Sequence, residues 1–275
     1  MTYTTLMVHL ELGRPNDGLL KIAGDLAKRL HAGVIGIAAR QPLQMIYGDG
    51  YFAGDVYERD CDEIAAELKE AELEFRTALE ARVPVIEWRS SQTTPYLADY
   101  LANEARGVDL IVTGVATGDF LDASRNVNTS DLIMQAGRPV RLVPTTATTL
   151  KLDRALVAWK DTRETRRAVS DALPLLKHAA AVTVVEIAAD ADLGGARRRV
   201  ADVVAWLSRH GVTTEGLAQL STGDDATALY ALGQDSGADV VVAGAYGHSR
   251  LREWVLGGVT RDLLLSANRC ALVSH

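Results

Sequence analysis

The chain has 275 residues, which predicts one large domain or two small ones at about 150 residues per domain. Its 36 acidic residues outnumber its 29 lysines and arginines, and the resulting net charge of −7 argues against nucleic-acid binding as the main role. Two cysteines are too few for a disulfide scaffold or a cysteine zinc site, and no apolar run reaches the roughly 18 residues of a membrane span. The N-terminus lacks the basic and apolar regions of a secretion signal, so we expect a cytoplasmic protein with no membrane partner.

Short apolar strands alternate with amphipathic helices along the chain. In the first half we expect strands at 6–10, 109–114 and 140–143, and a long helix at 60–80. In the second half we expect strands at 155–159, 181–187, 239–243 and 270–274, with helices at 164–176, 196–209, 226–236 and 260–267. This alternation predicts right-handed βαβ units, and therefore an α/β fold with a parallel sheet covered by helices on both faces.

The two halves of the chain repeat each other. Residues 109–114 resemble residues 239–244 at an offset of 130, and five of the ten residues in 129–138 recur at an offset of 131. The opening strands correspond at an offset of 149, so the first half carries about 19 extra residues between its first and fourth strands. The repeat predicts two tandem domains, 1–148 and 149–275. All the excess acid lies in the first half, which leaves the second half more favourable for an anionic ligand.

The extra residues of the first half centre on the segment 41–59, which contains three glycines, three tyrosines and Phe52. Two interpretations stay open for it. A surface loop can be packed by its own aromatic side chains, and a long segment without regular structure can be a lid or a partner surface.

A glycine-rich loop follows the buried strand 239–243. Gly244 and Gly247 leave the carboxyl end of this strand, where open α/β sheets bind their ligands, and Gly257 and Gly258 begin the next helix. Glycines let the backbone approach a phosphate closely, and the free N–H groups at a helix start attract an anion. The spacing Gly-x2-Gly-x9-Gly therefore favours a polyphosphate site, although a tight turn followed by a helix start explains the glycines equally well.

This loop resembles the nucleotide-binding signature of the universal stress protein family, in which Gly-x2-Gly-x9-Gly precedes a small hydroxyl residue. Gly244, Gly247 and Gly257 match the signature, whereas Gly258 replaces the hydroxyl residue. The resemblance covers both halves. It implies two tandem domains, each with a five-stranded parallel sheet of the doubly wound, Rossmann-like and adenine nucleotide hydrolase-like type. It also implies a stress-response protein that binds ATP or a similar nucleotide, with or without Mg, in its second domain.

Residue chemistry and the resemblance together predict a nucleotide site made of Ala158, Lys160, Asp161, Gly244, Gly247, His248, Arg250, Gly257, Gly258, Val259 and Thr260. In the family an aspartate after the first strand contacts adenine, and Lys160 holds that position here. Lysine donates only, so Lys160 cannot accept from the adenine amino group; it reaches a phosphate or points to solvent. Asp161 replaces the family's aspartate only if the loop shifts. His248 and Arg250 are either phosphate contacts or solvated loop side chains.

The equivalent loop of the first half has lost the features that favour phosphate. Asn126 and Val127 replace the glycine pair at the helix start, and Asp119 and Asp122 repel a phosphate. Glu11 matches the family's adenine-contacting acid, but alone it is an ordinary acid at a strand end. We therefore predict that the first domain does not bind nucleotide.

The sequence contains no Walker-type phosphate loop, no HExxH and no GxSxG, and its six histidines lack metal-ligand spacing. We therefore predict no catalytic residue and no metal site, and at most slow ATP hydrolysis. In the family, domains pair through their last strands, so we expect 140–143 to pair with 271–274 within the chain, while a homodimer stays open. The alternative function is a nucleotide-independent interaction or regulatory module that acts through 41–59.

Overall fold

The fold is described from a computed structural model. It describes residues 2–43, 53–92, 96–115, 125–245 and 269–275. The elements of the first half are β1 (Thr5–His9), α1 (Asp17–Leu30), β2 (Gly33–Arg40), α2 (Ala53–Leu79), β3 (Ile86–Gln92), α3 (Leu97–Glu104), the short η1 (Ala105–Gly107), β4 (Leu110–Gly114), α4 (Thr129–Gln135) and β5 (Val140–Val143). Those of the second half are β6 (Arg154–Ala158), α5 (Arg163–Leu176), β7 (Ala181–Ala188), the short η2 (Asp190–Asp192), α6 (Leu193–Arg209), β8 (Thr214–Leu220), α7 (Asp225–Asp235), β9 (Val240–Gly244) and β10 (Cys270–Ser274).

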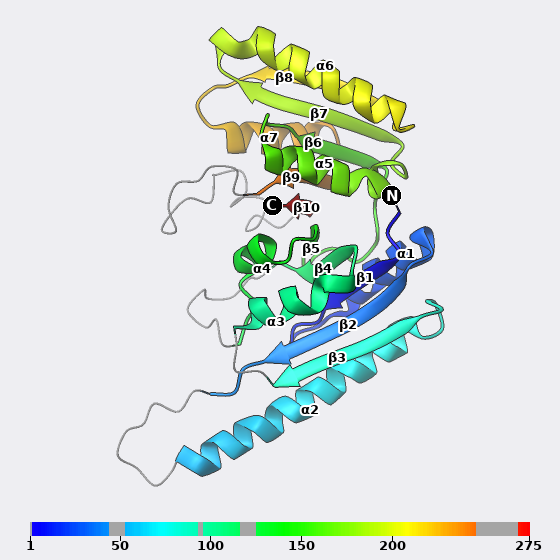
Figure 1. Ribbon diagram of the computed structural model, residues 1–275, viewed down its shortest axis with the longest axis vertical. Helices are drawn as coiled ribbons and strands as arrows, with labels where there is room; N and C mark the ends of the chain where they lie inside the picture. The colour runs from blue at the N-terminus through cyan, green and yellow to red at the C-terminus, as the bar shows by residue number, and fades with distance from the viewer. Residues whose placement is uncertain (1, 44–52, 93–95, 116–124, 246–268) are drawn as a thin grey trace.

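All ten strands form one continuous sheet in the order β3-β2-β1-β4-β5-β10-β9-β6-β7-β8. Neighbouring strands run parallel everywhere except at the centre, where β5 and β10 pair antiparallel. Each half thus supplies five parallel strands, and the edge strands β3 and β8 lie at opposite ends of the molecule (Figure 1). The predicted fold class is confirmed.

The last strands of the two halves meet as the sequence predicted. Leu142 lies opposite Ala271, and Val140 lies opposite Val273, so the expected pairing of 140–143 with 271–274 is confirmed. This pairing removes two strand edges from solvent and replaces them with backbone hydrogen bonds. The two halves therefore share a single sheet.

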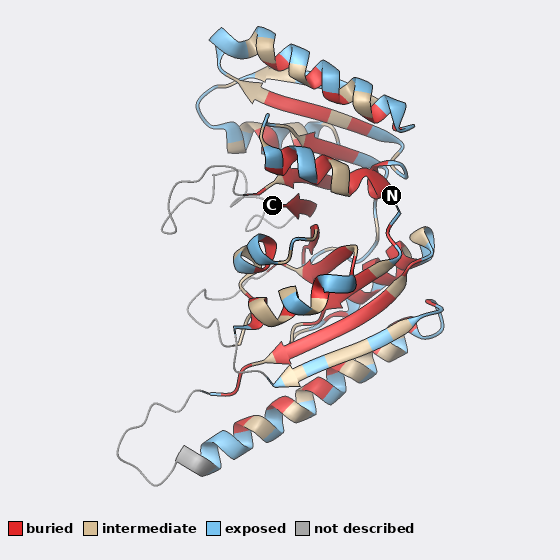
Figure 2. Cartoon of the chain, viewed as in Figure 1, coloured by how far each residue is buried: buried red, intermediate tan, exposed pale blue. Residues whose placement is uncertain are grey.

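Helices cover both faces of this sheet because the strands are apolar on both faces. Along β1, Leu6 and Val8 join one core cluster, with side chains of α1, α2, α5 and α6. The intervening Met7 joins the opposite cluster, with side chains of α3 and α4, and the second half continues that face with α7. Figure 2 shows the central strands as almost uniformly buried. None of the described helices is long and apolar enough to cross a membrane.

The same hydrogen-bond pattern anchors the first strand in both halves. Asp109, just before β4, accepts hydrogen bonds through Oδ2 from the backbone N–H groups of Thr4 (2.7 Å) and Thr5 (3.0 Å). Asp239, just before β9, accepts from Asp153 (2.9 Å) and Arg154 (3.0 Å) in the same way. These contacts pair residues at offsets of 130 and 149, the two offsets read from the sequence, so the repeat has a structural basis.

The long helix and one edge strand depart from the expected elements. α2 begins at Ala53, so the end of the segment 41–59 is helical and only its first part can be a loop. With 27 residues, α2 is longer than its counterpart α6, which has 17, and it accommodates part of the extra length. β8 was not predicted, and in the first half no range was predicted for α1, β2, β3, α3 or α4. The expected helix 260–267 lies outside the described residues.

Candidate functional site

The predicted site lies at the carboxyl edge of the second half, between β6 and β9. Chain order reverses here, and in α/β sheets such a reversal opens a ligand crevice beyond the strand ends. Ala158 ends β6, Gly244 ends β9, and Lys160 and Asp161 lie in the four-residue connection from β6 to α5. The structure brings these four predicted residues to one edge. The other predicted site residues, Gly247, His248, Arg250, Gly257, Gly258, Val259 and Thr260, lie outside the described part of the chain.

Gly244 allows the end of β9 to touch the first turn of α5. A Cβ atom at this position would lie 2.5 Å from the backbone nitrogen of Thr165 and 2.7 Å from the carbonyl carbon of Glu164. These distances are well below van der Waals contact, and both atoms belong to the helix backbone. Tight packing is therefore sufficient to explain this glycine, and its effect is to hold the start of α5 against the strand end.

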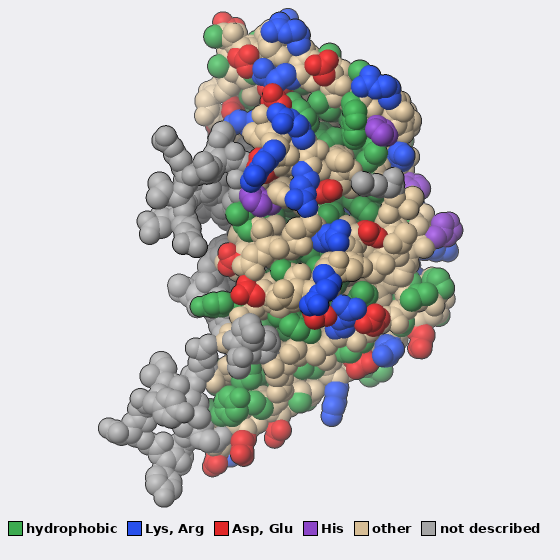
Figure 3. All heavy atoms as spheres, in the orientation of Figure 1, with side chains coloured by type: hydrophobic (Ala, Val, Ile, Leu, Met, Phe, Trp, Pro, Cys, Tyr) green, Lys and Arg blue, Asp and Glu red, His purple; other side chains and the backbone are tan. Residues whose placement is uncertain are grey.

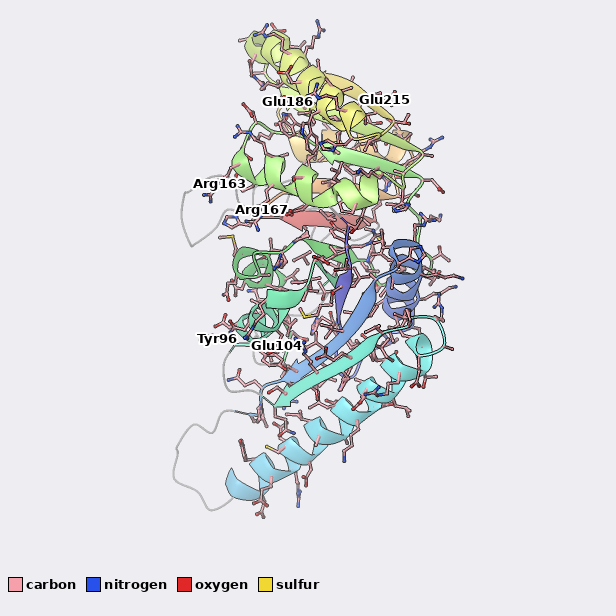
Figure 4. The ribbon with its side chains drawn as sticks, turned by 45° about the vertical axis from the view of Figure 1, so that its right-hand side comes forward. Tyr96, Glu104, Arg163, Arg167, Glu186 and Glu215 are labelled. Carbon is pink, nitrogen blue, oxygen red and sulfur yellow. The ribbon has the colours of Figure 1, made fainter. Side chains whose placement is uncertain are left out.

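The N-terminus of α5 is itself well ordered by short polar contacts. The Thr162 hydroxyl caps the helix by accepting from the Thr165 backbone N–H. Glu164 is buried and pairs with Arg163, whose exposed side chain projects from the start of the helix (Figure 4). Burial raises the pKa of Glu164, but its hydrogen bonds, chiefly that from Arg163, lower it below the ordinary value. Glu164 therefore stays ionised at neutral pH.

The two charged residues predicted to meet the nucleotide have different surroundings. Asp161 is exposed and pairs with Arg166, with 2.8 Å between Oδ1 and Nη2. Lys160 is also exposed, and among the described residues it forms no ion pair. Asp161 is thus already bound by an arginine, whereas Lys160 is available to an anion as far as the described residues go.

The corresponding edge of the first half has larger, hydrogen-bonded side chains. His9 ends β1 where Ala158 ends β6, and its Nδ1 lies 3.0 Å from the hydroxyl oxygen of Thr113, the counterpart of Ala243. Burial lowers the pKa of His9 to about 4, so the ring is neutral at physiological pH. Two alanines, Ala158 and Ala243, hold the corresponding positions in the second half.

Ion pairs complete the first-half edge. Glu11 lies beside Gly114, because a Cβ on that glycine would be 3.2 Å from its Oε1, and its other oxygen is 3.1 Å from Nη1 of Arg14. Burial raises the pKa of Glu11, and Arg14 opposes this shift. Arg125 pairs with the buried Asp60 of α2, and Arg40 pairs with Glu67. These charged side chains are therefore paired with one another.

The start of α4 is likewise capped by a side chain of this chain. Oδ1 of Asn128 accepts from the backbone N–H groups of Ser130 (3.0 Å) and Asp131 (3.2 Å). Val127 is buried in the core beside it. The donors that could bind an anion at this helix start are thus taken by a side chain of the protein. Sequence reasoning missed Asn128, although its counterpart at the offset of 131 is Val259, which has no side-chain acceptor.

Within the described residues, no group of three or more His, Cys, Asp or Glu side chains is arranged to hold a metal ion.

Comparison of the sequence with models of protein families finds no match, and comparison with curated proteins finds none either. Solved structures do match. A universal stress protein from Archaeoglobus fulgidus DSM 4304 superposes with a TM-score of 0.76 at 15% identity, covering 98% of this chain and 95% of that one. A functionally unknown protein from Pseudomonas aeruginosa PAO1 has a TM-score of 0.63 at 16% identity, with 99% and 92% covered. A candidate universal stress protein from Pseudomonas aeruginosa UCBPP-PA14 gives 0.62 at 16% identity, with 99% and 93% covered.

These likenesses define the class of fold. Over its whole length the chain has the tandem α/β fold of a universal stress protein, with two five-stranded parallel halves joined through their last strands.

Proposed function

We propose that the chain is a tandem universal stress protein that binds ATP or a similar nucleotide in its second domain, 149–275. The first domain, 1–148, is a repeat that does not bind nucleotide. The observation that carries this proposal is the difference between the two carboxyl edges. In the first half, side-chain pairs and the Asn128 cap occupy the polar groups, whereas the second half has alanines and a lysine that forms no ion pair with the described residues.

The described residues favour the phosphate end of a nucleotide. A phosphate needs positive charge and backbone donors, and Lys160 supplies the charge beside the glycine-rich loop that begins at Gly244. An adenine amino group needs an acceptor, and Asp161 is bound to Arg166 instead. We therefore expect Lys160→Ala to weaken ATP binding about tenfold, the loss expected for one charge-assisted contact, and to leave adenosine binding nearly unchanged. Lys160→Arg retains the charge and serves as the matched control.

The direct test is native mass spectrometry of freshly purified protein, followed by isothermal titration with Mg-ATP. We expect a bound nucleotide that is lost in Gly247→Val and in Gly257→Val, because a branched side chain blocks the backbone approach. Gly107→Val is the matched control, since no atom lies within 4 Å of the position its Cβ would take. If the purified protein carries no nucleotide, and Mg-ATP produces neither heat nor added thermal stability, the proposal is wrong.

A second function is favoured by one observation on α2. Val56 and Tyr57 are neighbours in the first turns of this helix, and they expose 54% and 38% of their surface. They belong to the segment 41–59 and offer apolar contacts to a protein partner or a second copy of the chain. Sedimentation equilibrium measures whether two copies of the chain associate. A dimer that dissociates in Val56→Ser/Tyr57→Ser, together with the absence of nucleotide binding, would favour this function over the first.

A further inference from the structure

The centre of the sheet, where β5 and β10 pair, contains a buried positive charge. Arg141 is an interior residue of β5, opposite Leu272 of β10, and its side chain has no exposed area. Within the part of the chain that the structure describes, none of its three guanidinium nitrogen atoms has a hydrogen-bond partner. An arginine stays protonated at any physiological pH, so this side chain brings a full charge into the core. Such a charge is very unfavourable unless something pairs with it.

Other polar groups gather on the same face of the sheet. Alternation along β5 places Arg141 with Val143 toward the cluster beneath α1 and α5. On β10, Ser274 follows Leu272 by two residues and faces the same side, and its hydroxyl is buried. Asp171, on α5, pairs with Arg167, with 3.6 Å between Oδ2 and Nε. β5, β10 and α5 thus each contribute a polar side chain near the seam.

The other polar groups near the seam have partners of their own. The Tyr3 hydroxyl donates to the backbone carbonyl of Asp171, and burial raises the pKa of Tyr3 while the nearby Arg141 lowers it. Burial also raises the pKa of Asp171, whereas a hydrogen bond with Ser274 and the charges of Arg167 and Arg138 lower it. Arg167 reaches across to the first half, where it donates to the carbonyl of Gly137 at 2.6 Å. Asp171 therefore pairs with Arg167, and among the described residues no ion pair joins it to Arg141.

We propose that Arg141 binds a small monovalent anion of the size of chloride at the seam between the two halves. The guanidinium without a partner selects for negative charge, and its enclosure in the core limits the ligand to a small ion. Since Arg141 belongs to β5 and lies opposite Leu272 of β10, the ion lies where the two halves meet.

The test measures the thermal midpoint Tm in sodium chloride and in sodium gluconate at equal ionic strength. Binding to the folded state alone raises Tm, and we expect about 2–4 °C in chloride for the wild type. Arg141→Leu introduces the residue found opposite it in Leu272, and it should abolish the difference. Arg197→Leu removes an equal charge from an exposed position on α6 and should retain the difference. Equal Tm values for the wild type in both salts, or an unchanged difference in Arg141→Leu, would overturn the proposal.

A second measurement tests the proposal even if Arg141→Leu does not fold. Crystals of the wild type grown in bromide should show an anomalous peak within hydrogen-bond distance of the Arg141 guanidinium, and its absence would refute the site. A direct ion pair between Arg141 and Asp171 is the competing arrangement. In that case Asp171→Asn lowers Tm equally in both salts, and the Tm of the wild type is the same in chloride and in gluconate. This result also overturns the proposal.

Discussion

Replacing Gly244 by alanine is expected to destabilise the second half through one contact. The backbone conformation at Gly244 lies outside the left-handed region, so alanine meets no conformational strain there. The new Cβ would, however, lie 2.5 Å from the Thr165 nitrogen and 2.8 Å from its Cα, and a helix backbone cannot move away as a side chain can. Overpacking of this kind costs about 1–3 kcal/mol. For a chain of this size we expect Tm to fall by about 4–8 °C at a cost of about 2 kcal/mol.

Gly114→Ala is the matched control because Gly114 ends β4 as Gly244 ends β9. Its nearest neighbour would be Oε1 of Glu11 at 3.2 Å, the end of a flexible side chain that can turn aside. Its free energy of unfolding should therefore change by less than about 1 kcal/mol. Urea unfolding followed by circular dichroism measures both variants. If Gly244→Ala is no less stable than Gly114→Ala, the tight contact between β9 and α5 is not what requires a glycine.

Three further predictions concern the first half. Asn128→Ala removes the cap of α4 and should lower the free energy of unfolding by about 1 kcal/mol in urea, whereas Asn128→Ser should restore most of the loss. The pKa of His9 falls from 6.5 to about 4 on folding, so the unfolded chain binds the proton first and stability declines as the pH drops from 6.5 to 4. The free energy of unfolding should fall by about 3 kcal/mol over this range, and in His9→Gln this pH-dependent loss should be absent from unfolding measurements. Asp109→Ala leaves two backbone N–H groups of the β1 start without their acceptor and should cost about 1–2 kcal/mol by the same assay, with Asp109→Asn costing less.

Much of the fold could be predicted from the sequence because its information is local. Each central strand is a short, β-branched apolar run, and such runs are buried on both faces in a parallel sheet. Outside α2, the predicted elements that the structure describes agree with it to within three residues. β8 escaped prediction because it is an edge strand: Glu215 and Leu217 are exposed, and no continuous apolar run marks it. The start of α2 escaped because its first turns carry mostly exposed side chains, which leave no apolar periodicity.

The candidate site, too, could be predicted only in part from the sequence. The sequence by itself determined the repeat, the glycine spacing and the residues that should lie at the second carboxyl edge, since each follows from the order of residues along the chain. Only the tertiary structure decided how those residues are used. Asp161 is neutralised by Arg166, Asn128 caps the start of α4, and Arg141 lies at the seam without a hydrogen-bond partner among the described residues. The physical reason is that a charge or a hydrogen-bond donor acts through the partners packed against it, and these partners come from distant parts of the chain.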